Sequence, residues 1–134
     1  MNVQYKSNKN ITPNEFIKIL NNSTLGERRP TEDLKSIKGM IDNADIIITA
    51  KIDNEIIGVA RSVTDFYYCC YLSDLAVDKK YQNKGIGKKL IQKTQKQLHN
   101  KCKIILLSAP DAIHYYPKIG FIKHDFAYHK KLLN

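Results

Sequence analysis

A short glycine- and lysine-rich segment has the residue types needed to bind a pyrophosphate. Gly85 and Gly87 stand at the expected start of a helix, where the lack of a side chain lets a ligand approach the backbone closely. The first amide groups of a helix have no partner inside it and point out of the end that attracts anions. Lys84, Lys88 and Lys89 add positive charge around the same point. The segment therefore predicts an anion site at the beginning of this helix.

Two common nucleotide-binding loops do not fit this segment. The dinucleotide-binding loop has a third glycine in the order G-x-G-x-x-G, and Leu90 takes that position here. The nucleoside triphosphate loop needs G-x-x-x-x-G-K followed by serine or threonine, whereas Gly87 is followed by two lysines without that spacing. Both loop types are therefore excluded.

These residues need strands and helices to position them, and the chain predicts both. Thr12 and Glu15 can cap each other's amides at a helix start, and Thr31 is expected to cap a second helix. A β-branched, apolar run before the two-residue turn Asp53–Asn54, and a second run that returns after it, predict an antiparallel hairpin. We expect strands at residues 2–6, 46–52, 55–63, 66–77, 103–108 and 121–131, and helices that begin at Thr12 and Thr31 and that span 85–99 and 111–116.

The order of these elements, β-α-α-β-β-β-α-β-α-β, predicts one α/β domain over residues 1–134. The strand at 66–77, the helix after it and the strand at 103–108 form a crossover, so the two strands should be parallel. The hairpin before them is antiparallel, and the sheet is therefore mixed.

Two motifs resemble a known family. Gln82-x-x-Gly85-x-Gly87, after Leu75-Ala76-Val77, resembles the acetyl-CoA loop of the GNAT superfamily of N-acetyltransferases. The segment from Ala112 to Phe121 is similar to the family's late A-x-x-F/Y-Y-x-K-x-G-F motif. One expected helix and one expected strand separate the two motifs, as in that family, and the chain looks like a small bacterial-type member. The resemblance implies a mostly antiparallel sheet whose central parallel pair splays apart around pantetheine.

The same resemblance implies a cofactor and its contacts. Acetyl-CoA would be the cosubstrate, with no metal, and backbone amides near the end of the strand at 66–77 would hold the oxyanion. The expected cofactor-binding residues are Leu75, Ala76, Val77, Gln82, Asn83, Lys84, Gly85, Ile86, Gly87, Lys88 and Lys89. Two positions depart from the family pattern: Ala109 stands where asparagine often contacts the cofactor, and Pro117 stands where glutamate is common.

In this family an acceptor amine attacks the thioester directly in a ternary complex, so a base and an acid are needed. The motif tyrosine maps onto Tyr116, which we expect to protonate the leaving thiolate. Its neighbour Tyr115 points roughly 100° away on a helix, so only one of the two should face the cleft. Asp74 is a candidate base or a solvated carboxylate, Asp65 is a second candidate, and a water chain is the alternative.

The acceptor is less defined by the sequence. Arg28 or Arg29 could clamp a substrate carboxylate or simply be solvated, and Tyr67 could line the same pocket with Tyr68 and Tyr71. A small polar amine is the leading acceptor, with a free amino acid as one candidate. An aminoglycoside, a polyamine or a protein N-terminus stays open, as does a non-catalytic module that only binds acyl-CoA.

Bulk composition is that of a globular protein, with 43% hydrophobic and 26% charged residues. The formal net charge of +9 suits an anionic ligand such as coenzyme A, and no motif for nucleic acid accompanies it. Without a long apolar run or a signal-peptide pattern, we expect a cytoplasmic protein that binds no membrane. The three cysteines have no metal-ligand spacing. A monomer and a homodimer are both compatible with the sequence.

Overall fold

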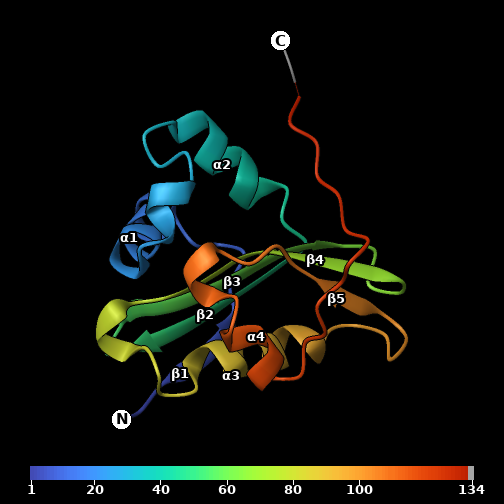
Figure 1. Ribbon diagram of the computed structural model, residues 1–134. Helices are drawn as coiled ribbons and strands as arrows, with labels where there is room; N and C mark the ends of the chain where they lie inside the picture. Colours follow the sequence, from blue (N-terminus) through green and yellow to red (C-terminus); the bar gives the residue numbers. More distant parts are fainter. Residues whose placement is uncertain (133–134) are drawn as a thin grey trace.

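The computed structural model describes residues 1–132 as a single mixed sheet with helices on both faces (Figure 1). The strands are β1 (Gln4–Ser7), β2 (Ile46–Ile52), β3 (Glu55–Thr64), β4 (Cys69–Val77) and β5 (Lys103–Ile105), and they lie in chain order across the sheet. Neighbours from β1 to β4 are antiparallel, whereas β4 and β5 are parallel. The predicted mixed α/β sheet with a parallel crossover pair is confirmed.

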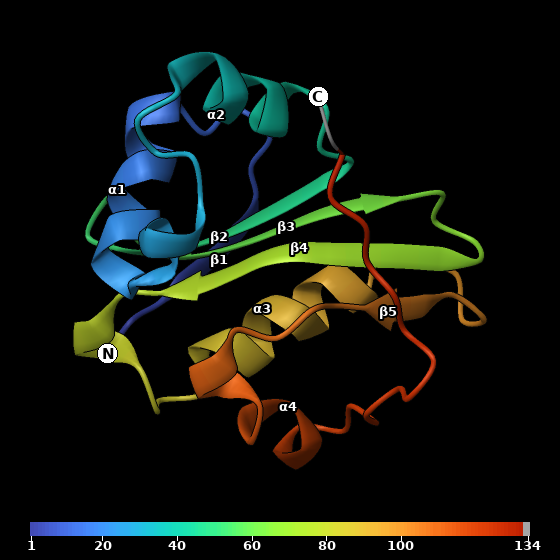
Figure 2. The same cartoon turned by 45° about the horizontal axis from the view of Figure 1, so that its top comes forward.

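Helices cover both faces of this sheet (Figure 2). α1 (Pro13–Ser23) and α2 (Leu34–Asp42) lie on one face, called here the α1/α2 face. α3 (Ile86–Gln95) and α4 (Tyr115–Lys118) lie on the opposite face, called the α3 face. Three short 3-10 turns complete the described elements: η1 (Leu25–Arg28), η2 (Lys79–Tyr81) and η3 (Pro110–Ala112). No helix within residues 1–132 is long and apolar enough to cross a membrane.

Side-chain caps explain where the first two helices begin. The Thr12 hydroxyl accepts the Glu15 amide at 3.1 Å, and the Glu15 carboxylate accepts the Thr12 amide at 2.9 Å, which is the predicted capping box. The predicted cap of α2 was wrong, because Asp33 and not Thr31 occupies that position. The Asp33 carboxylate accepts both the amide and the hydroxyl of Ser36, and a threonine hydroxyl cannot accept two such bonds as readily.

Apolar cores fill both sides of the sheet. On the α1/α2 face, Phe16 packs in a cluster with Val59 of β3, and neither side chain is exposed. On the α3 face, Leu90 packs in a cluster with Ile48 of β2. Gly58 lets α3 approach closely, because a Cβ there would lie 3.1 Å from Cδ1 of Leu90. Each fully buried side chain of this size stabilises the fold by about 1.5–3 kcal/mol, so these contacts fix α3 against the sheet.

The strand expected at 121–131 is absent from the described residues. A turn interrupts it, in which the Phe126 amide donates to Nδ1 of His124 at 3.1 Å. The segment passes β5 and rises beside the α1/α2 face (Figures 1 and 2). Ile122, Phe126 and Tyr128 are 79–94% exposed, so few contacts hold the segment in strand register. The parallel pair therefore lies at an edge of the sheet rather than at its centre.

Four other elements are shorter than predicted or divided. The strand expected at 103–108 ends at Ile105, where its pairing with β4 stops. β4 begins at Cys69 and not at Phe66, because the Asp65 carboxylate accepts three successive backbone amides and forms a turn there. The helix expected at 85–99 ends at Gln95, and the one expected at 111–116 is divided into η3 and α4. Asp65 is therefore a turn residue, and its pKa is lowered by the amides that it accepts.

Candidate active site

A slot opens where β4 and β5 stop pairing. The two strands pair only from Cys69 opposite Lys103 to Tyr71 opposite Ile105, while β4 continues to Val77. The edge of β4 beyond Tyr71 therefore has no strand partner among the described residues, and its amides are available to a ligand. This divergence matches the splayed pair that the family resemblance implied.

A β-bulge lies beside the slot. Arg61 of β3 pairs with Asp74, but the next residue, Ser62, pairs with Leu72, so Ser73 is an extra residue in β4. A bulge of this kind bends the strand and changes which side chains face each layer. Asp74 consequently lies on the α1/α2 face, whereas Leu72 joins the core on the α3 face.

The glycine-rich loop joins β4 to α3 in a fixed conformation. The Gln82 side-chain amide donates to the Val77 carbonyl at 3.0 Å, and Asp78 caps the η2 turn. Asn83 and Gly85 both adopt the left-handed conformation, with φ of 63° and 81°. Gly85 is the N-cap of α3, and no side chain caps this helix. The first amides of α3 are therefore open to an anion, as the sequence predicted.

The two glycines of the motif have different surroundings. A Cβ at Gly85 would meet nothing within 4 Å, so this glycine is required by its positive φ and leaves open space for a ligand. A Cβ at Gly87 would lie 2.8 Å from the hydroxyl oxygen of Tyr115, which is too close. The residues present thus fit a pyrophosphate at the start of α3, with Tyr115 beside it.

The expected cofactor-binding residues differ in whether their side chains are buried or exposed. Ala76 and Ile86 are only 2% exposed, so their side chains pack in the core and only their main chains remain to contact a ligand. Leu75 and Val77 are partly buried against the α3 face. The remaining side chains beside the loop are exposed, namely those of Gln82, Asn83, Lys84, Lys88 and Lys89.

Tyr115 and Tyr116 sit at the start of α4 with their rings 5.3 Å apart. The Tyr116 ring packs edge-on against Phe121 at 5.4 Å, and burial raises its pKa to about 12. Burial also raises the pKa of Tyr115. Both phenols therefore keep their protons at neutral pH and can donate hydrogen bonds.

Asp74 lies between two arginines. One carboxylate oxygen accepts Nε of Arg29, the other accepts Nε of Arg61, and the Asp74 side chain is completely buried. Arg29 also donates to the Ser73 carbonyl at 2.7 Å, and Arg61 donates to the Ser73 hydroxyl at 2.9 Å. Both carboxylate oxygens are therefore already engaged as acceptors of guanidinium N–H groups. This geometry does not fit the general-base role expected for Asp74.

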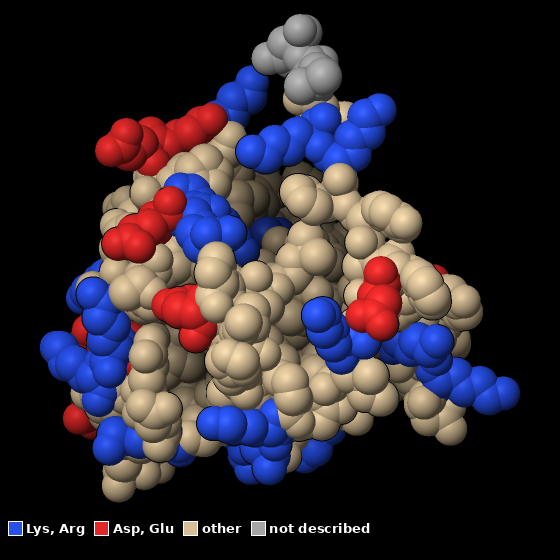
Figure 3. Space-filling model, in the orientation of Figure 1, with Lys and Arg blue, Asp and Glu red and all other residues tan. Residues whose placement is uncertain are grey.

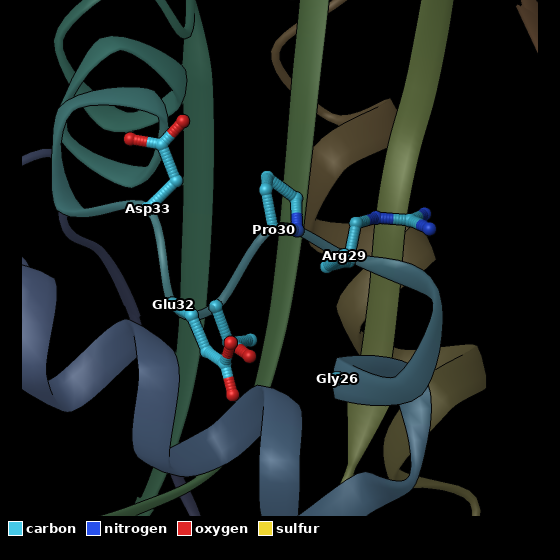
Figure 4. A pocket seen from close by; sticks show the side chains of 6 residues that line it. Gly26, Arg29, Pro30, Glu32 and Asp33 are labelled. Atoms are coloured by element: carbon cyan, nitrogen blue, oxygen red, sulfur yellow. The ribbon is translucent and has the colours of Figure 1, made fainter.

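The predicted acceptor residues do not all come together. Arg29, Glu32 and Asp33 all line one surface cavity of about 440 Å³. The Arg29 side chain, which follows η1, extends toward the sheet and away from the two carboxylates (Figure 4). Arg28 is exposed, and its carbonyl accepts a bond from Arg29.

Tyr67 belongs to a different region of the molecule. It lies between β3 and β4 and stacks on His99 at 5.4 Å, near the end of α3 that is opposite the glycine-rich loop. Tyr71 lies in β4, two residues before the extra residue Ser73. The placement of Tyr67 in the acceptor pocket is therefore not supported.

Sequence reasoning missed Arg61 and the bulge at Ser73. A signal for Arg61 was present, since it is the single charged residue inside the apolar run from Ile56 to Val63. A charge buried in a strand needs a partner, and Asp74 was the carboxylate available on the next strand. The bulge has no comparable signal, because the burial of β4 still alternates along the chain.

Comparison with known proteins decides the family. The family model described as "Acetyltransferase (GNAT) family" matches residues 14–121. This chain belongs to the GNAT family of acetyltransferases. The uncharacterized N-acetyltransferase ycf52 of Pyropia yezoensis is 30% identical over 127 residues, covering 90% of this chain and 71% of that protein. The chain spans little more than half of the ycf52 proteins of Porphyra purpurea (55%) and Gracilaria tenuistipitata var. liui (54%).

Solved structures share the fold of this GNAT protein. A GNAT family acetyltransferase from Streptococcus pneumoniae TIGR4 has a TM-score of 0.81 at 16% identity, covering 99% of this chain and 98% of that chain. An aminoglycoside acetyltransferase from an uncultured soil metagenomic sample, in complex with sisomicin, has a TM-score of 0.69 at 19% identity, covering 99% and 96%. The predicted family, fold and enzyme class, an acetyl-transferring enzyme, are thus confirmed. Among residues 1–132, no cluster of histidine, cysteine and carboxylate side chains could hold a metal.

Proposed function

We propose that this GNAT protein transfers the acetyl group of acetyl-CoA to the primary amine of a small polar molecule, with a free amino acid as the leading acceptor. One observation carries the proposal: the unpaired edge of β4 lies beside the open start of α3. Acetyl-CoA placed along that edge would have its pyrophosphate at the helix start. Its thioester carbonyl would lie near the backbone amides of Leu75, Ala76 and Val77.

The residues around the cofactor site suit a polyanion. Acetyl-CoA supplies an activated acyl group, and the chain supplies the means to bind and orient it. Lys84, Lys88 and Lys89 are exposed beside the first turn of α3 and add charge to its amides. Gly85 and Gly87 keep side chains away from the ligand.

Tyr116 is our proposed acid for the departing sulfur. Its raised pKa keeps the phenol protonated at neutral pH, and burial limits competition from water. Because Asp74 is held by two arginines, we propose that the attacking amine loses its proton to water rather than to Asp74. Direct attack in a ternary complex needs no other nucleophile from the protein.

The charge of the site bears on the acceptor. On the α1/α2 face, two arginines hold Asp74 in the part of β4 that borders the slot, and the whole chain has a net charge of +9. A polyamine or an aminoglycoside, although the latter is acted on by a protein of the same fold, would meet repulsion here. A protein N-terminus is compatible with the charge and is the second candidate.

An amine panel tests the proposal. Purified protein is mixed with acetyl-CoA and single amines from each class, and release of the free thiol is measured. We expect release that depends on both the amine and the protein. If the protein binds acetyl-CoA but no amine stimulates thiol release, it is a binding module without transferase activity.

A further inference from the structure

The arginine pair around Asp74 has more hydrogen-bond donors than the described residues accept. Arg29 and Arg61 each use three N–H groups, on Asp74, on Ser73 and on the carbonyl of Arg28 or Met40. A guanidinium group has five N–H donors, so each arginine keeps two that no described residue accepts. The Arg61 side chain is only 8% exposed and that of Arg29 is 22% exposed.

The positive charge of this cluster also exceeds its negative charge. Two arginines face one carboxylate, which leaves one net positive charge in a largely buried place. Buried charge without a partner is costly, and donors without acceptors add to that cost. Figure 3 shows a hollow between the helices of the α1/α2 face and the C-terminal segment, with Lys or Arg atoms visible deep inside it. An anion bound beside Arg29 and Arg61 would satisfy both the charge and the donors.

The cluster lies beside the slot between β4 and β5. Asp74 is in the part of β4 that has lost its pairing with β5, on the face that carries η1 and α2. An anionic group bound by Arg29 would therefore lie close to the slot, and in the same small molecule an amine could reach the slot. This closeness fits the carboxylate of a small amino acid better than a distant charge on a large substrate.

An exposed apolar row lies next to the cluster. Tyr71 pairs with Val63 on one side and with Ile105 on the other, so the three side chains cross three strands on one face. Val63 is two residues from Arg61 in β3, which places this row about 7 Å from the arginine pair on the same face. Val63, Tyr71 and Ile105 are 46%, 40% and 51% exposed, although they belong to the sheet. Helices α1 and α2 leave this row uncovered.

We propose that the acceptor is an amino acid with an apolar side chain, and that the Arg29–Asp74–Arg61 cluster binds its carboxylate. Its side chain lies on the row of Val63, Tyr71 and Ile105, and its amine points into the slot. The inference rests on the proposed acetyl transfer. In that step the amine nitrogen forms a bond to the acetyl carbon, the carbon–sulfur bond breaks, and its electrons leave with the sulfur. The amine loses one proton and the thiolate gains one, so atoms and charge balance.

Three acceptors that differ by one group test the inference. Phenylalanine has the amine, the carboxylate and the apolar side chain; phenethylamine lacks the carboxylate; serine lacks the apolar side chain. We expect kcat/KM for phenylalanine to exceed that for each of the others at least about tenfold, the usual loss for an unpaired buried polar group or an empty apolar site. Calorimetry with coenzyme A present should show that phenylalanine binds and that phenethylamine binds at least about tenfold more weakly.

Variants separate binding by Arg29 from a general effect of charge. Arg29→Gln keeps a hydrogen-bonding side chain but removes the charge, and it should abolish the preference for phenylalanine over phenethylamine. Lys38→Gln removes one positive charge from an exposed site on α2 and should keep the preference.

The outcomes distinguish the two proposals. If phenethylamine reacts as well as phenylalanine in the unaltered protein, the carboxylate site is wrong while acetyl transfer stands. If serine reacts as well as phenylalanine, the apolar row does not select the acceptor. If no amine reacts and calorimetry shows no binding of phenylalanine, both proposals fail. Binding of phenylalanine without turnover would support the site and overturn the transferase.

Discussion

Tyr115 and Tyr116 are adjacent in the chain but have different surroundings in the fold. The Tyr115 hydroxyl lies against Gly87 at the start of α3, whereas the Tyr116 ring packs on Phe121. No described residue forms a hydrogen bond with either phenol. We therefore propose two tasks, contact with the bound cofactor for Tyr115 and proton donation for Tyr116, in place of the expectation that only one of the two faces the cleft.

Substitution of each tyrosine separates these tasks. Tyr116→Phe should lower kcat at least about tenfold with little change in the affinity for acetyl-CoA, because only the proton donor is lost. Tyr115→Phe should instead weaken acetyl-CoA binding by a few-fold, since it removes one hydrogen bond near the phosphate site. Steady-state kinetics and direct binding measurements check both. Unchanged turnover in Tyr116→Phe would remove it as the acid.

The raised pKa of Tyr116 predicts a loss of stability in alkali. The unfolded chain releases this phenol proton near its ordinary pKa of about 10. The folded protein keeps it until a pKa of about 12. Between these values the folded state binds more protons, so stability falls as the pH rises through this window. Urea unfolding at about pH 9 and pH 12 should show this fall, and in Tyr116→Phe the fall should be about 2 kcal/mol smaller. Equal falls in both proteins would contradict the burial of this phenol.

Asp74 is predicted to stabilise the fold rather than to act as a base. Asp74→Asn leaves two arginines around a neutral side chain, and breaking a buried ion pair in this way costs about 3 kcal/mol. Urea unfolding at neutral pH measures this loss. Asp42→Asn, at the exposed end of α2, is the matched control and should change stability by less than about 0.5 kcal/mol. A similar small change in Asp74→Asn would show that the ion pairs contribute little.

The sequence predicted the cofactor side of the site better than the acceptor side. Residues 82–89 form a local motif whose glycines have a function readable from their spacing. The contacts of Asp74 depend on Arg29, 45 positions earlier in the chain, and on a bulge, and neither is encoded locally. Tyr67 and Tyr71 are equally plausible as pocket residues until the Asp65 turn fixes where β4 begins.

At the scale of elements, the start of α3 depends on the backbone of one glycine. Gly85→Ala forces a side chain into the left-handed conformation at φ 81°, which costs about 1–2 kcal/mol. We expect lower stability together with weaker acetyl-CoA binding, because the amides of the first turn move. Thermal unfolding and binding measurements check these effects.

Gly39 provides the control for this substitution. It lies inside α2, and a Cβ there would meet nothing within 4 Å. Gly39→Ala should therefore stabilise the protein by about 0.5–1 kcal/mol and leave cofactor binding unchanged. If both alanine variants behave alike, the left-handed turn at residue 85 is not what forms the site.

Periodicity and turn residues account for most of the predicted elements. The β2–β3 hairpin is confirmed with Asp53 and Asn54 both left-handed, as a two-residue turn requires. The strand predicted at 121–131 was wrong, because the apolar pattern there is not matched by contacts with the body of the protein. Alternation shows that a segment can form a strand, but pairing needs a partner edge in register.

At the scale of the whole molecule, the net charge of +9 should act on cofactor capture. Coenzyme A carries several phosphate charges, and screening by salt weakens attraction between exposed charges. KM for acetyl-CoA should therefore rise several-fold between low salt and about 0.5 M salt. S-acetylpantetheine, which lacks the nucleotide phosphates, should show a much weaker dependence. An equal salt dependence for both donors would mean that the charge acts on another step.

The extra residue in β4 has a consequence for how this strand can change. Even-numbered positions from Cys70 to Ala76 are all buried, yet Leu72 contacts one layer and Ala76 the other, because Ser73 shifts the frame between them. Even-numbered positions thus face the α3 layer before Ser73 and the α1/α2 layer after it. Substitutions before Ser73 alter the surface on which we propose the acceptor rests, and substitutions after it alter the wall beside the thioester. Acceptor preference and donor binding can therefore diverge independently within nine consecutive residues.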